Sequence, residues 1–183
     1  MRRSKWTERK FTFDFPEGWM YNIVDRLRGT ISRLEALTLQ LPEDSLYLKP
    51  GETWSIKEHI GHLADLEDLH NGRIDDFISA KAILRAADMS NQRTEKALHH
   101  DRAVDELLDE FREKRNMLIQ RLLSLDEETL SRLSLHPRLQ VMMRPVDMAY
   151  FTAEHDDHHL TSIHFLAERR HPFTFLPLST VVL

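Results

Sequence analysis

Four long stretches of the chain carry apolar residues three and four positions apart, and this spacing constrains the fold more than any other feature. Residues spaced in this way line one face of a helix. The stretches cover residues 17–41, 55–87, 101–125 and 145–170. Each helix must bury its apolar face against the others. The sequence therefore predicts an all-α protein, a four-helix bundle that forms a single domain over residues 1–183.

Signals at the ends of these stretches support the helices. Ser55 is followed three residues later by Glu58, which is the pattern of a capping box. Pro145 suits the first position of a helix, where its missing N–H would have no partner anyway. We expect the second helix to break, if anywhere, at Gly72, and we expect residues 88–100 to form a loop.

Both ends of the chain are apolar but lie outside the predicted helices. Phe11, Phe13 and Phe15 alternate with polar residues, as in a short extended arm with one aromatic face. The segment 173–183 is also rich in apolar residues. Exposed apolar segments of this kind tend to form interfaces, so we expect both arms to cover the bundle or to help form a homodimer.

Composition excludes several classes of function. The net charge of −5 gives no reason to expect a nucleic acid as partner. No segment approaches the roughly 20 consecutive apolar residues that span a membrane, and no signal peptide is evident, so we expect a cytoplasmic protein without membrane contact. Cysteine is absent, which excludes disulfides, thiolate nucleophiles and zinc–thiolate sites.

A concentration of histidines in the last predicted helix suggests a metal site. His155 and His159 are four residues apart, so they share a face of the helix and can offer two imidazole nitrogens to one metal ion. They lie on the apolar stripe that faces the core, whereas His158 points elsewhere. The alternative is that these histidines are ordinary hydrogen-bonded helix residues, and a third ligand is needed to decide.

The second predicted helix supplies candidates for that third ligand. His59 lies near the centre of its apolar face, and His62 lies on the shoulder of that face. Periodicity alone does not choose between His59 and His62.

Two sequence patterns resemble signatures of the DinB/YfiT-like superfamily of metalloenzymes. The stretch over residues 54–65 has the Trp-Ser helix start and, eight residues beyond Trp54, a histidine that corresponds to a metal ligand, His62. The late pattern is a histidine, three residues and then the second histidine of a pair, which matches His155 and His159. The resemblance covers these two helices in the expected order, and His59 is additional to the usual pattern.

This resemblance has definite implications for fold and site. It implies an up-down-down-up bundle, often dimeric, in which three histidines hold nickel or zinc and leave positions open for water or substrate. In this chain those ligands would be His62, His155 and His159. Glu58 and Asp65 lie about one turn on either side of His62, where either could orient its imidazole. Trp54 could line the pocket or anchor the start of the helix in the core.

The sequence leaves three hypotheses for function. The first is a metal-dependent enzyme acting on a small molecule, either a thiol S-transferase that uses a low-molecular-weight thiol or a hydrolase. The second is a non-catalytic stress protein that binds a metal or a small ligand, and the third is a helical interaction module. No basic cluster that would select a particular thiol is evident, and the sequence identifies no catalytic residue. A P-loop, a dinucleotide-binding fingerprint and an H-E-x-x-H motif are all missing from the sequence.

Overall fold

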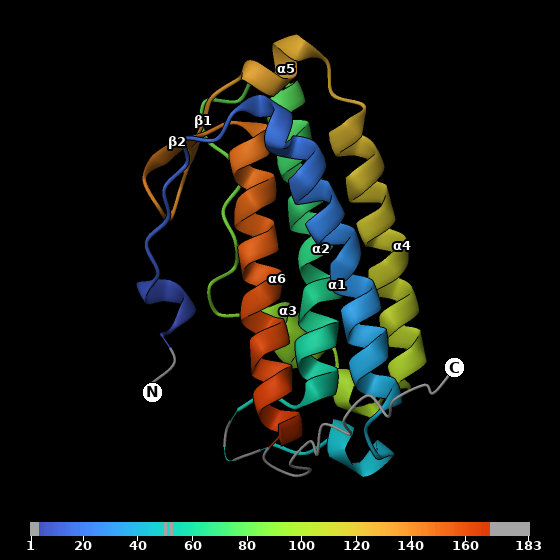
Figure 1. The fold of residues 1–183 in the computed structure, drawn as a ribbon. Coiled ribbons are helices and arrows are strands. Elements are labelled where there is room, and N and C mark those ends of the chain that lie inside the picture. The colour runs from blue at the N-terminus through green and yellow to red at the C-terminus, as the bar shows by residue number, and fades with distance from the viewer. Residues whose placement is uncertain (1–3, 50, 52, 169–183) are drawn as a thin grey trace, which may run out of the picture.

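The computed structural model describes residues 4–49, 51 and 53–168, and its main elements are four long helices (Figure 1). They are α1 (Met20–Leu39), α2 (Ile56–Ile78), α4 (Val104–Leu123) and α6 (Pro145–Glu168). They pack side by side as a bundle, which confirms the predicted fold class. The predicted capping box is present, because the Ser55 hydroxyl accepts from Glu58 N–H and the Glu58 carboxylate accepts from Ser55 N–H.

The order of helix directions follows the up-down-down-up topology that the family resemblance implied. In Figure 1, α1 runs down the bundle, α2 and α4 both run up it, and α6 runs down again. Two consecutive parallel helices need a connection that returns along the length of the bundle. Residues 79–103 provide that connection.

The prediction that the second helix extends to residue 87 is wrong, because α2 ends at Ile78. Ala80 adopts a left-handed conformation with φ of 49°. Its N–H donates to the Phe77 carbonyl (3.0 Å), and Lys81 N–H donates to the Asp76 carbonyl (2.9 Å). This pair of bonds at a left-handed residue is the Schellman pattern that ends helices.

Asp76 then fixes the direction of the chain beyond the helix. Its buried carboxylate accepts from the backbone N–H of Arg85 at 2.8 Å, from the Arg85 guanidinium and from Lys81 Nζ. The predicted break at Gly72 does not occur. Gly72 instead makes room for Arg85, because a Cβ there would lie 1.9 Å from Arg85 Nη1.

The predicted loop over residues 88–100 contains two short helical elements. They are α3 (Gln92–Lys96) and the 3-10 turn η4 (His99–Asp101). His99 packs so closely on Gly61 that a Cβ at Gly61 would lie 2.2 Å from the imidazole Cγ. The next short helix, α5 (Glu127–Ser131), falls where the sequence shows acidic residues after α4.

A small antiparallel hairpin precedes α6 and was not predicted. It consists of β1 (Ser134–His136) and β2 (Val141–Met143), with Leu135 opposite Met142. Leu135 also bonds to the connection between α2 and α4, since its N–H donates to Ala82 (2.9 Å) and its carbonyl accepts from Leu84 N–H (3.0 Å). The hairpin therefore holds the connection against the bundle.

Two of the three apolar clusters among the described residues are separated by a layer of buried charge. Both clusters draw on all four main helices, represented in the first by Leu34, Ile60, Phe111 and Leu160 and in the second by Leu27, Ile74, Leu118 and Ala149. Along each helix a polar residue falls between the two clusters: Thr30 on α1, Glu67 on α2, Arg115 on α4 and Asp156 on α6.

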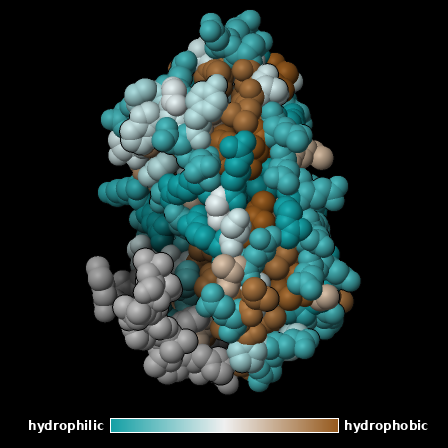
Figure 2. Space-filling model, turned by 45° about the vertical axis from the view of Figure 1, so that its right-hand side comes forward, coloured by the Kyte–Doolittle hydropathy of each residue, from teal (hydrophilic) through white to brown (hydrophobic). Residues whose placement is uncertain are grey.

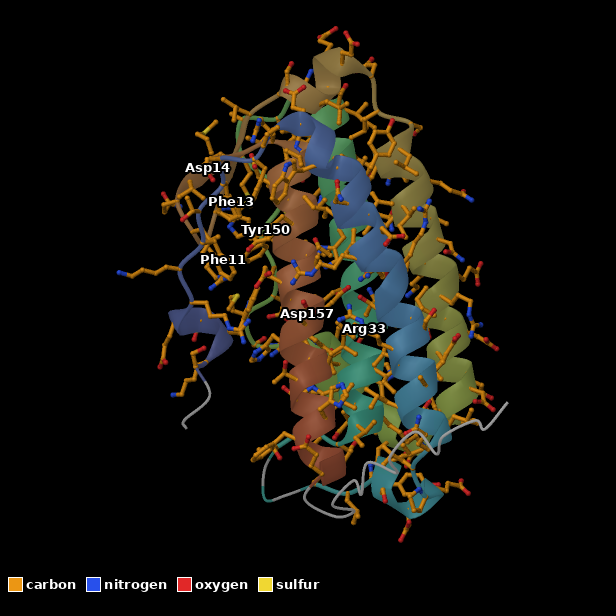
Figure 3. All side chains as sticks on the ribbon, viewed as in Figure 1. Phe11, Phe13, Asp14, Arg33, Tyr150 and Asp157 are labelled. Atoms are coloured by element: carbon orange, nitrogen blue, oxygen red, sulfur yellow. The ribbon has the colours of Figure 1, made fainter. Side chains whose placement is uncertain are left out.

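The N-terminal arm packs on the outer side of α6, as its aromatic pattern predicted. Phe11 meets Phe151 edge to face with ring centroids 5.1 Å apart, and Phe13 meets Tyr150 at 6.3 Å. Figure 3 shows Phe11 and Phe13 beside Tyr150. The Arg144 guanidinium donates to the Phe15 carbonyl at 2.8 Å, which fixes the end of the arm. The predicted C-terminal arm, residues 173–183, lies outside the described residues.

The surface over α1 and α4 carries apolar side chains. Figure 2 shows hydrophobic atoms among hydrophilic ones on this face of the molecule. Exposed apolar residues of these two helices include Leu39, Met117 and Leu123. None of the helices in the described part of the chain combines the length and the apolar character needed to cross a membrane.

We predict that Arg115→Met destabilises the protein strongly. Arg115 is 0% exposed and bonds to both Glu67 and Asp156, so its loss leaves two buried carboxylates without their cation. Removing one partner of a buried ion pair typically costs about 3–5 kcal/mol. Urea unfolding at neutral pH measures the change. The matched control, Arg112→Ala, removes an arginine from the surface of the same helix and should cost less than about 1 kcal/mol. Equal losses in the two variants would contradict the prediction.

Candidate metal centre

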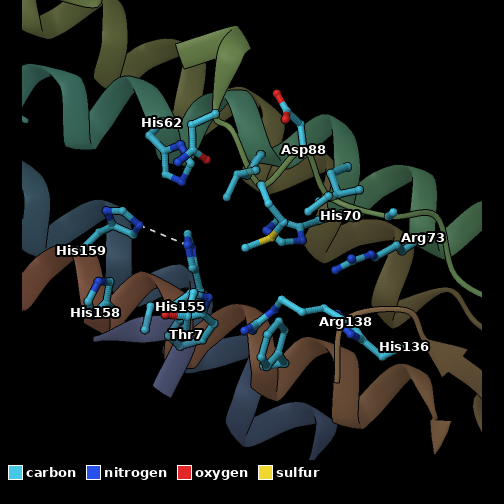
Figure 4. Close-up of a pocket in the computed structure, with 18 of the residues that line it drawn as sticks. Thr7, His62, His70, Arg73, Asp88, His136, Arg138, His155, His158 and His159 are labelled. Atoms are coloured by element: carbon cyan, nitrogen blue, oxygen red, sulfur yellow. Dashed lines mark hydrogen bonds between the residues drawn. The ribbon is translucent and has the colours of Figure 1, made fainter. Parts of the chain in front are cut away.

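The largest concentration of histidines lines a pocket between α2 and α6. The pocket has a volume of about 600 Å³, which is within the range of small-molecule sites. The N-terminal arm, the connection between α2 and α4 and the turn of the hairpin form its other walls. Figure 4 shows His62, His155 and His159 at one end and Arg73, His136 and Arg138 at the other.

The structure brings together the three histidines that the sequence suggested as metal ligands. Each of His62, His155 and His159 offers one ring nitrogen, and these three nitrogens lie within 4.8 Å of one another. Nε2 of His155 and Nε2 of His159 are 3.1 Å apart. The His62 ring centroid lies 4.8 Å from that of His159. Side chains from two helices far apart in sequence thus converge on one point.

These imidazoles are held in their neutral form. Burial lowers the pKa of His62 to about 4, although Asp65 acts in the opposite direction. Burial, and then the neighbouring imidazoles, place the pKa of His155 and His159 well below the ordinary value. A neutral imidazole has a lone pair on one nitrogen, which is the form that binds a metal.

A hydrogen-bonded chain fixes which nitrogen of His62 carries the proton. The Thr94 hydroxyl donates to Asp65 Oδ2 at 2.9 Å, so its oxygen accepts from Nδ1–H of His62 at 3.0 Å. The lone pair of His62 is therefore on Nε2. His99 Nε2 also lies 2.8 Å from Asp65 Oδ2 and fixes the carboxylate. Asp65, one of the two predicted orienting residues, thus acts on His62 through Thr94.

Of the other residues that the sequence placed near the candidate ligands, some line the pocket and one, Glu58, is held elsewhere. Glu58 is occupied by the capping box and by Lys49, so it does not orient His62. Trp54 does line the pocket, where its ring centroid lies 4.6 Å from that of His62. His59 also reaches the cluster, with Nδ1 at 2.8 Å from His159 Nδ1. His158 lies on the pocket wall, with Nδ1 at 3.3 Å from Arg9 Nη2.

Several residues of the pocket were missed by sequence reasoning. Trp6, in the 3-10 turn η1 (Trp6–Glu8), lies over the pocket with its ring centroid 5.0 Å from that of His155. Arg73 and Arg138 also line the pocket, but neither belongs to a sequence motif that indicates a binding site. His70 falls on the apolar face of α2 in the sequence, and this was the one available signal for its burial in the pocket wall.

The three histidines fit a divalent metal ion. Their donor set consists of neutral imidazoles that project into one pocket, and His155 Nδ1 is buried without a hydrogen-bond partner among the described residues. The arrangement has three candidate ligands from two helices and opens onto a pocket, as catalytic sites do. Imidazole suits zinc, nickel, copper and iron, so the donors alone do not select one metal.

Comparisons with known proteins agree with the fold. The family model described as the DinB superfamily matches residues 26–163. A solved structure, YfiT from Bacillus subtilis, superposes with a TM-score of 0.73 at 17% identity, covering 91% of this chain and 95% of that chain. YfiT is described as a probable metal-dependent hydrolase with an unusual four-helix bundle topology. No curated protein matches the chain.

We predict that the metal-free protein loses stability as the pH falls from about 6.5 towards 4. Burial lowers the pKa of both His62 and His136 to about 4. The unfolded chain, with histidine pKa values near 6.5, then binds more protons than the folded protein. Stability is fully present above about pH 6.5 and decreases below it, by at most about 1.4 kcal/mol per histidine and pH unit.

Urea unfolding in the presence of a chelator, at several pH values in this range, measures the effect. His136→Gln should reduce the pH dependence, whereas His164→Gln, on the exposed face of α6, should not change it. An unfolding midpoint that stays constant between about pH 6.5 and 4.5 would show that these histidines are not buried in neutral form.

Proposed function

The chain belongs to the DinB superfamily, and on that premise we propose that it is a metal-dependent enzyme acting on a small molecule. His62, His155 and His159 would hold the divalent ion, with zinc or nickel as the expected metals. The pocket beside them would receive the substrate. The observation that carries this proposal is the convergence of three neutral imidazoles on one point of that pocket.

A divalent ion at such a site lowers the pKa of a bound water or thiol and polarises a substrate oxygen. Several residues of the protein hold the site in a form that suits a divalent ion. Thr94 and Asp65 hold His62 in the tautomer whose Nε2 lone pair is available. Trp54 and Trp6 line the pocket beside these histidines, with ring centroids 4.6 Å from that of His62 and 5.0 Å from that of His155. His59 lies close enough to His159 to accept or return a proton there.

The reaction we propose is a substitution in which the oxygen of a water or the sulfur of a thiol forms a bond to an electrophilic centre of the substrate. The bond from that centre to the leaving group breaks, and the proton of the nucleophile passes to the leaving group. YfiT, which has the same fold, is described as a probable metal-dependent hydrolase, and this favours water as the nucleophile. A low-molecular-weight thiol is the other candidate. A screen of ester and amide hydrolysis, and of thiol transfer to electrophiles, separates the two reactions. A protein that binds metal but turns over no substrate would correspond to the alternative, a non-catalytic metal or small-ligand binder.

Two expectations from the sequence stay predictions. We propose that a homodimer forms through the exposed apolar residues of α1 and α4, and sedimentation equilibrium measures the oligomeric state. A cytoplasmic location is the second of these predictions.

We predict that the purified protein contains a stoichiometric divalent metal and that single histidine changes remove it. Alanine at position 62, 155 or 159 deletes a ligand and should abolish tight binding. Metal analysis of each variant by mass spectrometry, together with circular dichroism to establish folding, measures the result.

The controls are the two histidines that lie beside the cluster. His158→Ala and His59→Ala should both retain the metal, because neither belongs to the group of converging nitrogens. Loss of metal in His59→Ala with retention in His62→Ala would show that the third ligand has been assigned incorrectly.

We also predict that Thr94→Val weakens metal binding without abolishing it. Valine has the same shape but cannot accept the Nδ1 proton of His62, so this imidazole is no longer fixed in one tautomer. Loss of such an orienting partner typically costs about 10–100-fold in affinity. Competition with a chromogenic chelator measures the dissociation constant. Thr12→Val, on the exposed side of the arm, is the matched control. Equal affinity in Thr94→Val and the unmodified protein would contradict an orienting role.

A further inference from the structure

The end of the pocket away from the metal-site histidines contains a buried arginine without a carboxylate partner. Arg73 on α2 is 2% exposed. Its guanidinium donates from Nε to the Arg85 carbonyl (3.1 Å) and from Nη1 to Met148 Sδ (3.6 Å). Both oxygens of Asp76 are bound by Lys81 and Arg85, and Arg73 forms no ion pair with a carboxylate of the described residues.

Two further donors line the same end of the pocket. Arg138, in the turn of the hairpin, has its Nη2 buried without a hydrogen-bond partner among the described residues. His136 accepts from Leu139 N–H at Nδ1 (3.2 Å), so its proton is on Nε2. This Nε2–H is also buried without a partner in the part of the chain that the structure describes. Arg138 and His136 thus each present a donor that faces no acceptor among the described residues, and Arg73 adds a buried positive charge at the same end of the pocket.

Bringing these groups together is unfavourable without a ligand. Burial lowers the pKa of Arg73 to about 10; the charge of Asp76 acts in the opposite direction, and the charges of Arg138 and Arg85 lower the pKa further. Both guanidinium groups lower the pKa of His136, again after burial. Like charges in a buried site repel, and buried polar hydrogens without acceptors cost free energy. An anion would relieve both costs at once.

We propose that Arg73, Arg138 and His136 form a subsite for an anionic group, a carboxylate or a phosphate, of a small molecule bound in the pocket. A guanidinium matches the two oxygens of either group with two parallel hydrogen bonds. The inference deepens the proposed function, since it assigns the class of substrate for the site beside His62, His155 and His159. Figure 4 shows the arginines and these histidines at opposite ends of the pocket, so one elongated molecule can meet both.

The walls of the subsite indicate what is attached to the anion. The Arg138 guanidinium lies over the rings of Phe151 (5.6 Å) and Trp6 (5.8 Å). The His136 ring centroid is 5.1 Å from that of Phe151. Aromatic walls favour an apolar or aromatic body next to the charged group. Benzoate and phenyl phosphate therefore represent the two anions, and benzamide is their neutral counterpart.

Isothermal titration of the metal-free full-length protein with these three compounds tests the proposal. Removing the metal with a chelator ensures that the anion cannot bind to the ion instead. Benzoate or phenyl phosphate should bind at least about tenfold more tightly than benzamide, as expected for charge-assisted hydrogen bonds. The anion with the higher affinity identifies the group as a carboxylate or a phosphate. Equal affinity of all three compounds would overturn the proposal.

Variants locate the binding to the subsite. Arg138→Gln should reduce the affinity for the preferred anion by about tenfold or more, and Arg73→Gln should do the same if the variant folds. Arg28→Gln, which removes one positive charge from the exposed face of α1, should leave the affinity unchanged. Unchanged affinity in Arg138→Gln, or an equal loss in Arg28→Gln, would show that these residues do not form the site.

Metal analysis of the same variants separates this inference from the proposed function. Arg138→Gln should retain the metal, because Arg138 does not belong to the histidine cluster. If the unmodified protein binds no metal but still prefers the anions, the subsite stands and the metal-dependent function fails. If the metal is bound but the anions are not preferred over benzamide, the function stands and the subsite fails.

Discussion

The bundle depends on one buried guanidinium that touches all four main helices. Arg115 on α4 donates to Glu67 on α2 (2.7 Å), to Asp156 on α6 (3.0 Å) and to the Leu27 carbonyl on α1 (3.2 Å). Thr30 completes the layer by donating to Asp156 at 2.8 Å. Apolar contacts alone would tolerate sliding of one helix along another. A charge with its partners on three other helices has one satisfied arrangement, so it fixes the register of the bundle.

This layer also positions the candidate metal centre. Asp156 is adjacent to His155 in the sequence, and Glu67 lies between His62 and His70 on α2. The helices that Arg115 holds in register are therefore the two that supply the three converging imidazoles. The positive charge of Arg115 also helps to lower the pKa of His155 and His70. Burial is the main cause of the low pKa of His155, and Arg115 adds to it, so the same interaction holds the two helices in register and favours the neutral form of His155.

The sequence predicted the parts of the molecule that repeat a local pattern. Apolar periodicity located the four helices, and the capping box at Ser55 located the start of α2. The predicted helix over residues 79–87 is wrong. The alanines, lysine and leucine of this segment favour a helix, but Asp76 and Arg85 fix a different path of the chain. Their contacts are not part of any local sequence pattern. The histidine spacing and the family resemblance suggested the three candidate ligands, which the fold brings together. Thr94, Trp6 and the two pocket arginines could not be predicted, because each reaches the site only through the fold.

The two ends of the site differ in the segments that hold their side chains in place. The histidine end is built from α2 and α6, which the buried layer holds rigidly. At the other end Arg138 lies in the hairpin turn, and Arg73 is fixed by a carbonyl of the connection between α2 and α4. Turns and connections tolerate changes of sequence that packed helices do not. Changes in the hairpin or the connection could therefore alter which anion the pocket accepts while the imidazole cluster stays intact. In this fold the helices would then determine the chemistry, and the connections would determine the substrate.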